Sequence, residues 1–131
     1  MAATVERGPA LITITVSGEL TADDLFVVAY ELAQLDPIAP AVPRLTDTTG
    51  AIGVRLHFTA INRFAEQRRQ STLAGPVKAA WLAGSDLTFQ VGRAYAGVLN
   101  HPQITLEVFR DRDEALAWLG VGPEDLSVGN P

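Results

Sequence analysis

Val77-Lys78-Ala79-Ala80-Trp81-Leu82-Ala83 is a short, mostly apolar run that lacks the regular alternation of a half-exposed strand. This pattern predicts a strand that is buried on both faces, as in a parallel sheet covered by helices. Residues 11–17, 44–47 and 104–109 form three further runs that are apolar or rich in β-branched side chains, and a helical pattern follows each of the four. The repetition predicts an α/β domain with one mostly parallel sheet of four to five strands and about four helices.

The segments between these runs are long enough for helical crossovers, so we expect the four strands to be parallel neighbours in one sheet. Residues 4–7 come before the turn signal Gly8-Pro9 and predict an additional edge strand in an antiparallel hairpin. Thr21 and Asp24 form a capping-box pair that predicts the start of the first helix, and Asp36-Pro37 predicts its end.

Thr59 is the expected cap of the second helix, which would run to about residue 73. Its apolar residues, Ile61, Phe64 and Ala65, would face the core, whereas Arg63, Arg68 and Arg69 would mostly face water. Together with Arg55 these arginines form the one segment of the sequence in which basic residues outnumber acidic ones. It is interpreted as a solvated helix face or, alternatively, as a patch for an acidic partner or an anionic ligand.

Ser85 or Asp86 is the expected cap of the third helix, and Asp111 with Glu114 that of the last. The apolar face of the third helix, which is expected to be buried, is predicted to hold Leu87, Val91, Ala94, Tyr95 and Val98. Trp81 and Trp118 are interpreted as core residues. Gly92 and Gly97 suggest a close helix approach, within the chain or between two copies, and we expect a homodimer.

Length and composition restrict the class of protein. The chain has 131 residues, of which 47% are hydrophobic and 19% charged, which predicts one domain over residues 1–120 and a flexible tail over residues 121–131. A net charge of -5 argues against binding to nucleic acid. Cysteine is absent, and no apolar stretch is long enough for a membrane helix or a signal peptide. A cytoplasmic protein is therefore expected.

No catalytic signature is present in the sequence. A phosphate-cradling loop, a dinucleotide fingerprint, a nucleophile elbow and a histidine metal motif are all missing, so we expect no catalytic residue, no cofactor and no metal site. The two histidines are His57, between Leu56 and Phe58, and His101, at a predicted helix end. Packing or helix-end roles are favoured for both over catalysis.

Asp47-Thr48-Thr49-Gly50 follows the second predicted strand, at the edge where open α/β sheets usually carry their sites. Gly84-Ser85-Asp86 follows the third strand and should lie at the same edge, so we expect Thr48 or Thr49 to be accessible beside it. Aspartate at the first position and glycine at the fourth fit a simple β-turn. A phosphoacceptor and another ligand-binding role are the alternatives.

These residues resemble the SpoIIAA-like, or STAS, superfamily of anti-sigma-factor antagonists. Residues 47–53 are similar to the Asp-Ser-Ser-Gly-Leu-Gly loop of the antagonists, and residues 77–120 look like uncharacterised bacterial STAS and SEC14-type proteins. The resemblance covers roughly residues 10–120 and implies a SpoIIAA-like fold. It also implies that Thr49 occupies the position that a partner kinase phosphorylates and Thr48 the preceding hydroxyl. In the antagonists a helix follows this loop almost directly, whereas here residues 54–58 come before Thr59.

We therefore expect a noncatalytic binding or regulatory module. Its partner would be a protein, such as a kinase-type anti-sigma factor, or a small apolar, lipid-like ligand in a crevice between helices and sheet, as the SEC14-type resemblance suggests. An enzyme with an unidentified reaction and a purely structural or oligomerising role are the alternatives.

Overall fold

The computed structural model describes residues 3–126. Its elements in chain order are β1 (Ala3–Arg7), β2 (Ile12–Thr21), α1 (Ala22–Leu35), β3 (Arg44–Arg55), α2 (Phe58–Arg69), β4 (Val77–Leu82), α3 (Asp86–Leu99), β5 (Ile104–Phe109), α4 (Arg112–Leu119) and α5 (Pro123–Leu126). The five strands form one sheet in the order β1-β2-β3-β4-β5. Strands β2 to β5 are mutually parallel neighbours and β1 pairs antiparallel with β2, which confirms the predicted sheet and hairpin.

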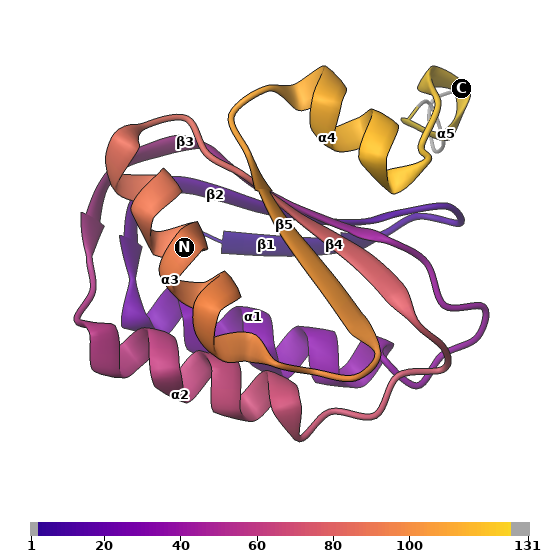
Figure 1. The fold of residues 1–131 in the computed structure, drawn as a ribbon, viewed down its shortest axis with the longest axis horizontal. Coiled ribbons are helices and arrows are strands. Elements are labelled where there is room, and N and C mark those ends of the chain that lie inside the picture. The colour runs from indigo at the N-terminus through magenta and orange to yellow at the C-terminus, as the bar shows by residue number, and fades with distance from the viewer. Residues whose placement is uncertain (1–2, 127–131) are drawn as a thin grey trace.

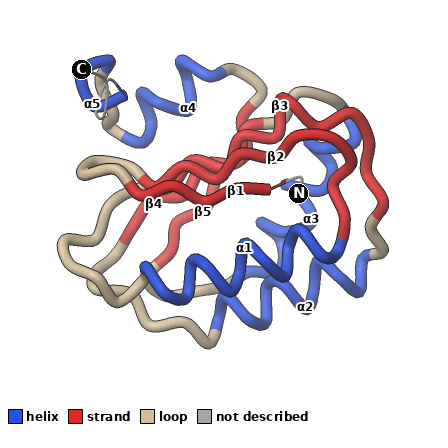
Figure 2. Tube along the Cα trace, turned by 180° about the vertical axis from the view of Figure 1, so that it is seen from behind, coloured by secondary structure: helices blue, strands red, loops and turns tan. Residues whose placement is uncertain are grey.

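Helices cover both faces of this sheet. Figures 1 and 2 show α1, α2 and α3 on one face and α4 on the other. Successive residues of β4 point to opposite faces, so that Trp81 packs in the core under α1–α3 while Ala80 and Leu82 pack in the core under α4. This is the reason why residues 77–83 show no polar alternation.

Helix caps follow the sequence signals closely. Thr21 and Asp24 form a capping box at the start of α1, and Asp36 is its C-cap. Ser85 and Thr88 form a second capping box at the start of α3. The Asp111 side chain accepts a hydrogen bond from the Glu114 backbone N–H at the start of α4. These side chains satisfy backbone N–H groups that a helix start leaves without a partner.

The predicted turn at residues 47–50 is wrong, because β3 continues through it to Arg55. Beyond Asp47 the backbone of β3 still pairs with β2, which supplies hydrogen-bond partners as far as Arg55. Thr15 pairs with Asp47 and Ser17 with Gly50, so β3 carries one extra residue in this interval and forms a β-bulge at Thr48 and Thr49. Helix α2 then begins at Phe58 with His57 as its N-cap, and Thr59 is not the cap.

Two other side-chain expectations need correction. Arg68, which was expected to face water, is buried, because the buried stripe of α2 extends to residue 68. Leu87, which was expected in the buried stripe of α3, is 57% exposed, because that stripe begins at Thr88. Trp118 is partly buried and packs against the core under α4, as expected, although Ala115, Leu116 and Leu119 are more fully buried. Its ring lies 5.5 Å from that of Phe109, between centroids.

The predicted tail at residues 121–131 is partly structured. Val121 is buried under α4, and α5 follows it. Residues 127–131 of that predicted tail lie outside the described residues.

Candidate functional site

The segments selected from the sequence meet where β4 ends, beside the bulge within β3. A Cβ atom added at Gly84 would lie 2.7 Å from the Cα of Thr49, so the exit of β4 packs directly against the bulge of β3. Thr49 is exposed, whereas Thr48 is fully buried and its hydroxyl donates to the Leu82 carbonyl over 2.7 Å. Of the two candidate hydroxyls, only that of Thr49 is accessible there.

Polar contacts fix the Thr49 side chain. Its hydroxyl donates to Oδ1 of Asp47 over 2.6 Å, and Arg112 donates to Oδ2 of the same carboxylate. Burial raises the pKa of Asp47, but the hydrogen bonds from Thr49 and Arg112 outweigh burial and hold that pKa below its ordinary value. Because this segment is a strand and α2 starts only at Phe58, a phosphate on Thr49 would not meet the free N–H groups at the start of α2.

The two histidines have different environments and do not share a pocket. His101 accepts a hydrogen bond at Nδ1 from the Gln103 N–H over 2.9 Å, so Nε2 donates to the Ser71 carbonyl over 2.7 Å. It therefore ties the end of α3 to the segment after α2, a structural role. His57 is exposed and lines a surface groove between α1 and α2, described below.

A buried ionic cluster, which the sequence did not predict, lies on the side of the sheet covered by α1–α3. The Asp36 carboxylate accepts from Arg44 over 2.7 Å and from Arg68 over 2.7 Å, and the Ser71 hydroxyl also donates to it. The side chains of Asp36, Arg44 and Arg68 are at most 4% exposed. The spacing of Arg68 from Ile61, Phe64 and Ala65 could have revealed its burial, because all four share one helical face.

This ionic cluster, Asp36 with Arg44 and Arg68, carries one more positive than negative charge. Burial raises the pKa of Asp36, but its contacts with Arg68, Ser71 and Arg44 outweigh burial and hold that pKa below the ordinary value. Burial also raises the pKa of the nearby Tyr95 to about 12, so its hydroxyl stays protonated at neutral pH. Two guanidinium groups thus share a single carboxylate.

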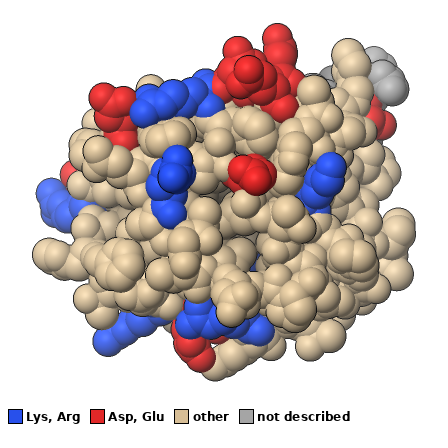
Figure 3. Space-filling view, in the orientation of Figure 1, with Lys and Arg blue, Asp and Glu red and all other residues tan. Residues whose placement is uncertain are grey.

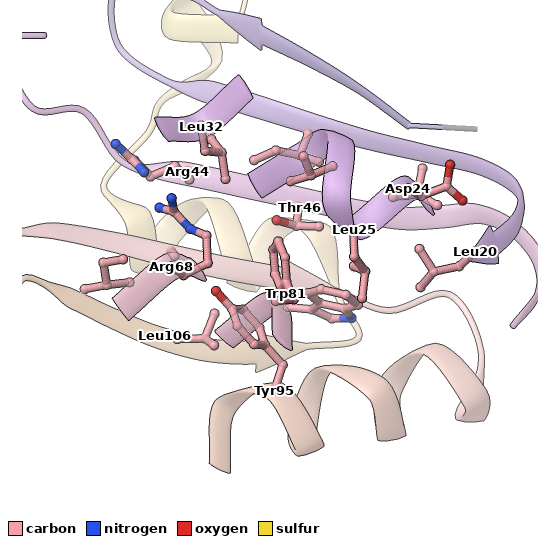
Figure 4. A pocket seen from close by; sticks show the side chains of 16 residues that line it. Leu20, Asp24, Leu25, Leu32, Arg44, Thr46, Arg68, Trp81, Tyr95 and Leu106 are labelled. Carbon is pink, nitrogen blue, oxygen red and sulfur yellow. The ribbon is translucent and has the colours of Figure 1, made fainter. Parts of the chain in front are cut away.

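A narrow cavity begins at this ionic cluster and runs between the sheet and α1–α3. Its volume is about 40 Å³, room for a water molecule or a few carbon atoms. Figure 4 shows Arg44 and Arg68 at one end, Leu20 and Asp24 at the other, and Trp81, Tyr95 and Leu106 between them. The lining is apolar apart from the ionic end, Thr46, Asp24 and the Tyr95 hydroxyl; its apolar members include Ile14, Val16, Leu25, Val28, Leu32, Phe64, Ala79 and Ile104.

Two side chains are shared between this cavity and a groove on the surface. Leu25 and Phe64 line the cavity and also line the surface groove between α1 and α2, which has a volume of about 510 Å³. The groove continues over Phe26, which is 61% exposed, and past Asp23, His57 and Arg63. An outward movement of Leu25 and Phe64 would therefore join the buried cavity to an open groove.

Other classes of site receive little support from the described residues. No group of three or more histidine, aspartate and glutamate side chains within residues 3–126 is placed to hold a metal ion. None of the described helices has the length and apolar character that crossing a membrane requires. On the face drawn in Figure 3, lysine and arginine side chains stand apart or beside acidic ones and form no continuous basic patch.

Gly92 and Gly97 on α3 have different surroundings. A Cβ at Gly92 would overlap the indole of Trp81, whereas a Cβ at Gly97 would have no neighbouring atom within 4 Å. The close approach at Gly92 is thus within the chain. The homodimer stays a prediction that now depends on Gly97 alone, and sedimentation at micromolar concentration tests it.

Comparison with solved structures shows what this fold resembles. An uncharacterised protein of the DUF3478 family from Shewanella loihica PV-4, described as having a SpoIIAA-like fold, aligns with a TM-score of 0.57 and 20% identity, covering 90% of this chain and 92% of that chain. No family model matches this chain, and neither does any curated protein. The chain therefore has the SpoIIAA-like fold that its sequence resemblance implied.

Proposed function

We propose that this protein is a noncatalytic binding module that holds a small, largely apolar molecule in the cavity between α1–α3 and the sheet. The observation that carries the proposal is the cavity itself, an apolar channel inside the core with a small polar group of residues at one end. Sites for small molecules are typically concave and mostly apolar, with a few polar groups that fix the orientation of the ligand.

The size of the cavity determines how a ligand would be held. A volume of about 40 Å³ is too small for a lipid-like molecule, so binding requires Leu25 and Phe64 to move apart. The ligand would then occupy both the cavity and part of the groove between α1 and α2. Leu25 and Phe64 would close behind it and exclude water from its apolar part.

Filling the cavity tests this proposal. Octanoate and octanol serve as probes, with the midpoint of thermal unfolding as the readout, because a ligand that binds only the folded state raises it. Val28 lines the cavity from α1, so Val28→Phe should abolish the shift. Tyr30, on the same helix, is 64% exposed, and Tyr30→Phe should leave the shift unchanged. The same shift in a folded Val28→Phe variant would contradict the proposal.

A second candidate is a regulatory protein that is phosphorylated on Thr49. The exposure of Thr49 beside Gly84 favours it, and a phosphate there would compete with Asp47 for Arg112. A kinase of the type that acts on anti-sigma-factor antagonists should then modify the wild type and Thr48→Val but not Thr49→Ala, and Thr49→Glu should weaken binding of the protein partner. Absence of phosphate on Thr49 after incubation with such a kinase would rule this candidate out.

A further inference from the structure

We infer that the ligand of the cavity is an amphiphilic carboxylate, with its carboxylate against Arg44 and Arg68 and its hydrocarbon chain directed towards Leu25 and Phe64. The inference rests on the proposed binding function and adds the chemical class of the ligand. It comes from the position of the ionic cluster, which forms one end of the cavity. Figure 4 shows the two guanidinium groups together at that end.

Charge at the ionic end favours an anion. In the described part of the chain, Asp36 is the only carboxylate that forms an ion pair with Arg44 or Arg68. The Tyr95 hydroxyl lies near Arg68 and stays protonated, so it adds no negative charge. Buried charges are normally paired, and one bound carboxylate would balance the two guanidinium groups.

Donors for such a carboxylate are present at the same place. The hydrogen bonds in the structure use Nε and Nη1 of Arg44, to Val42 and Asp36, and both Nη atoms of Arg68, to Asp36. They leave Nη2 of Arg44 for a further acceptor, and the Tyr95 hydroxyl, which interacts with Arg68, lies on the same lining with that of Thr46. Guanidinium groups bind carboxylates well because they present several N–H donors in one plane.

The opposite end of the cavity fixes the direction of the ligand. Asp24 is buried there, and its Oδ2 accepts hydrogen bonds from the backbone N–H and the hydroxyl of Thr21. A second carboxylate beside Asp24 would be repelled, whereas a hydrocarbon chain passes along Val28 and between Leu25 and Phe64 without losing a hydrogen bond. The head group therefore lies at the arginine end and the chain points towards the groove.

A series of probes with one chain and different head groups tests the inference on the unaltered protein. Isothermal titration with octanoate, octanol and octylamine should give the tightest binding for octanoate, by about tenfold or more over octanol, and the weakest for octylamine. Equal binding of octanoate and octanol would overturn the carboxylate inference and leave the proposed function standing. Absence of binding by all three probes would overturn the proposed function and the inference with it.

Two arginine variants on one helix locate the head group. Arg68→Gln should reduce the preference for octanoate over octanol, whereas Arg63→Gln, in the exposed groove, should not. The reverse result would place the carboxylate in the groove and overturn the inference. Tyr95→Phe removes one hydrogen-bond donor and no charge, so it should weaken the binding of octanoate less than Arg68→Gln does. If Arg68→Gln fails to fold, the head-group series on the wild type still decides the question.

Discussion

The backbone of Gly92 on α3 lies against the indole ring of Trp81 on β4, so closely that a Cβ at residue 92 would fall 2.5 Å from Trp81 Cδ1. The same indole donates from Nε1 to the Thr88 carbonyl over 3.0 Å. The ring is thus fixed between the sheet and α3 and cannot move aside without breaking this hydrogen bond.

Gly92→Ala should therefore lower the free energy of unfolding by about 1–3 kcal/mol, the usual cost of overpacking a core. Gly97→Ala is the matched control on the same helix, because a Cβ there would have no neighbouring atom within 4 Å. It should raise the free energy of unfolding by roughly 0.5–1 kcal/mol through helix propensity. Urea denaturation measures both, and equal effects would contradict the packing of Trp81 on Gly92.

Asp36→Asn should be strongly destabilising, because it leaves Arg44 and Arg68 buried without a negative partner. We expect a loss of about 3–5 kcal/mol in the free energy of unfolding, as for a buried pair that loses one member. Glu66→Gln removes the acidic member of an exposed pair with Arg69 and should change stability very little. A small effect at Asp36 in urea denaturation would show that the ionic cluster contributes little to the fold.

Acid should weaken the protein through the same carboxylate. The pKa of Asp36 is lower in the folded protein than its ordinary value, so its contribution to stability is present above the unfolded-state pKa and is lost as pH falls through the folded-state value. The free energy of unfolding should decline below about pH 4, and less steeply in Asp36→Asn than in the wild type. Parallel pH profiles of the two proteins would refute this assignment.

Thr48 and Thr49 should respond differently to loss of their hydroxyls. Thr48→Val removes a buried donor and leaves the Leu82 carbonyl without its hydrogen bond, which should cost about 1–3 kcal/mol. Thr49→Val changes an exposed side chain and should cost less than the buried substitution. Chemical denaturation of both variants provides the measurement, and a larger loss for Thr49→Val would contradict the bulge geometry.

Elements with a strong local signal were predicted correctly from the sequence. The four parallel strands, of which only β3 is much longer than predicted, the β1–β2 hairpin and the capping residues Thr21, Ser85 and Asp111 are in their predicted places. Each depends on side chains within a few residues of one another, such as Thr21 with Asp24. Local hydrogen bonds and periodicity decide such features largely by themselves.

The candidate site was predicted less well, because its features depend on residues far apart in the chain. Residues 47–50 fit a turn locally, but β2 supplies backbone partners for β3 that hold the segment in a strand. Arg68 is charged and lies among other arginines, so it was expected on the solvated face of its helix. Asp36, at the end of α1, nevertheless provides a buried partner for it. Thr49 is exposed beside the exit of β4, as expected, but it lies in a bulge within β3 and not at the end of that strand.

The strands lie in the sheet in the same order as in the chain. During synthesis each new βα unit can therefore add to the edge left by the previous one, and no strand has to be inserted between two that have already paired. A nascent chain that has emerged as far as α3 would present β4 as an open edge with unpaired backbone groups, the kind of edge that invites association with other chains. Strand β5 then pairs with that edge and α4 covers the outer face of β4, so both stay uncovered until residues 104–119 have been synthesised.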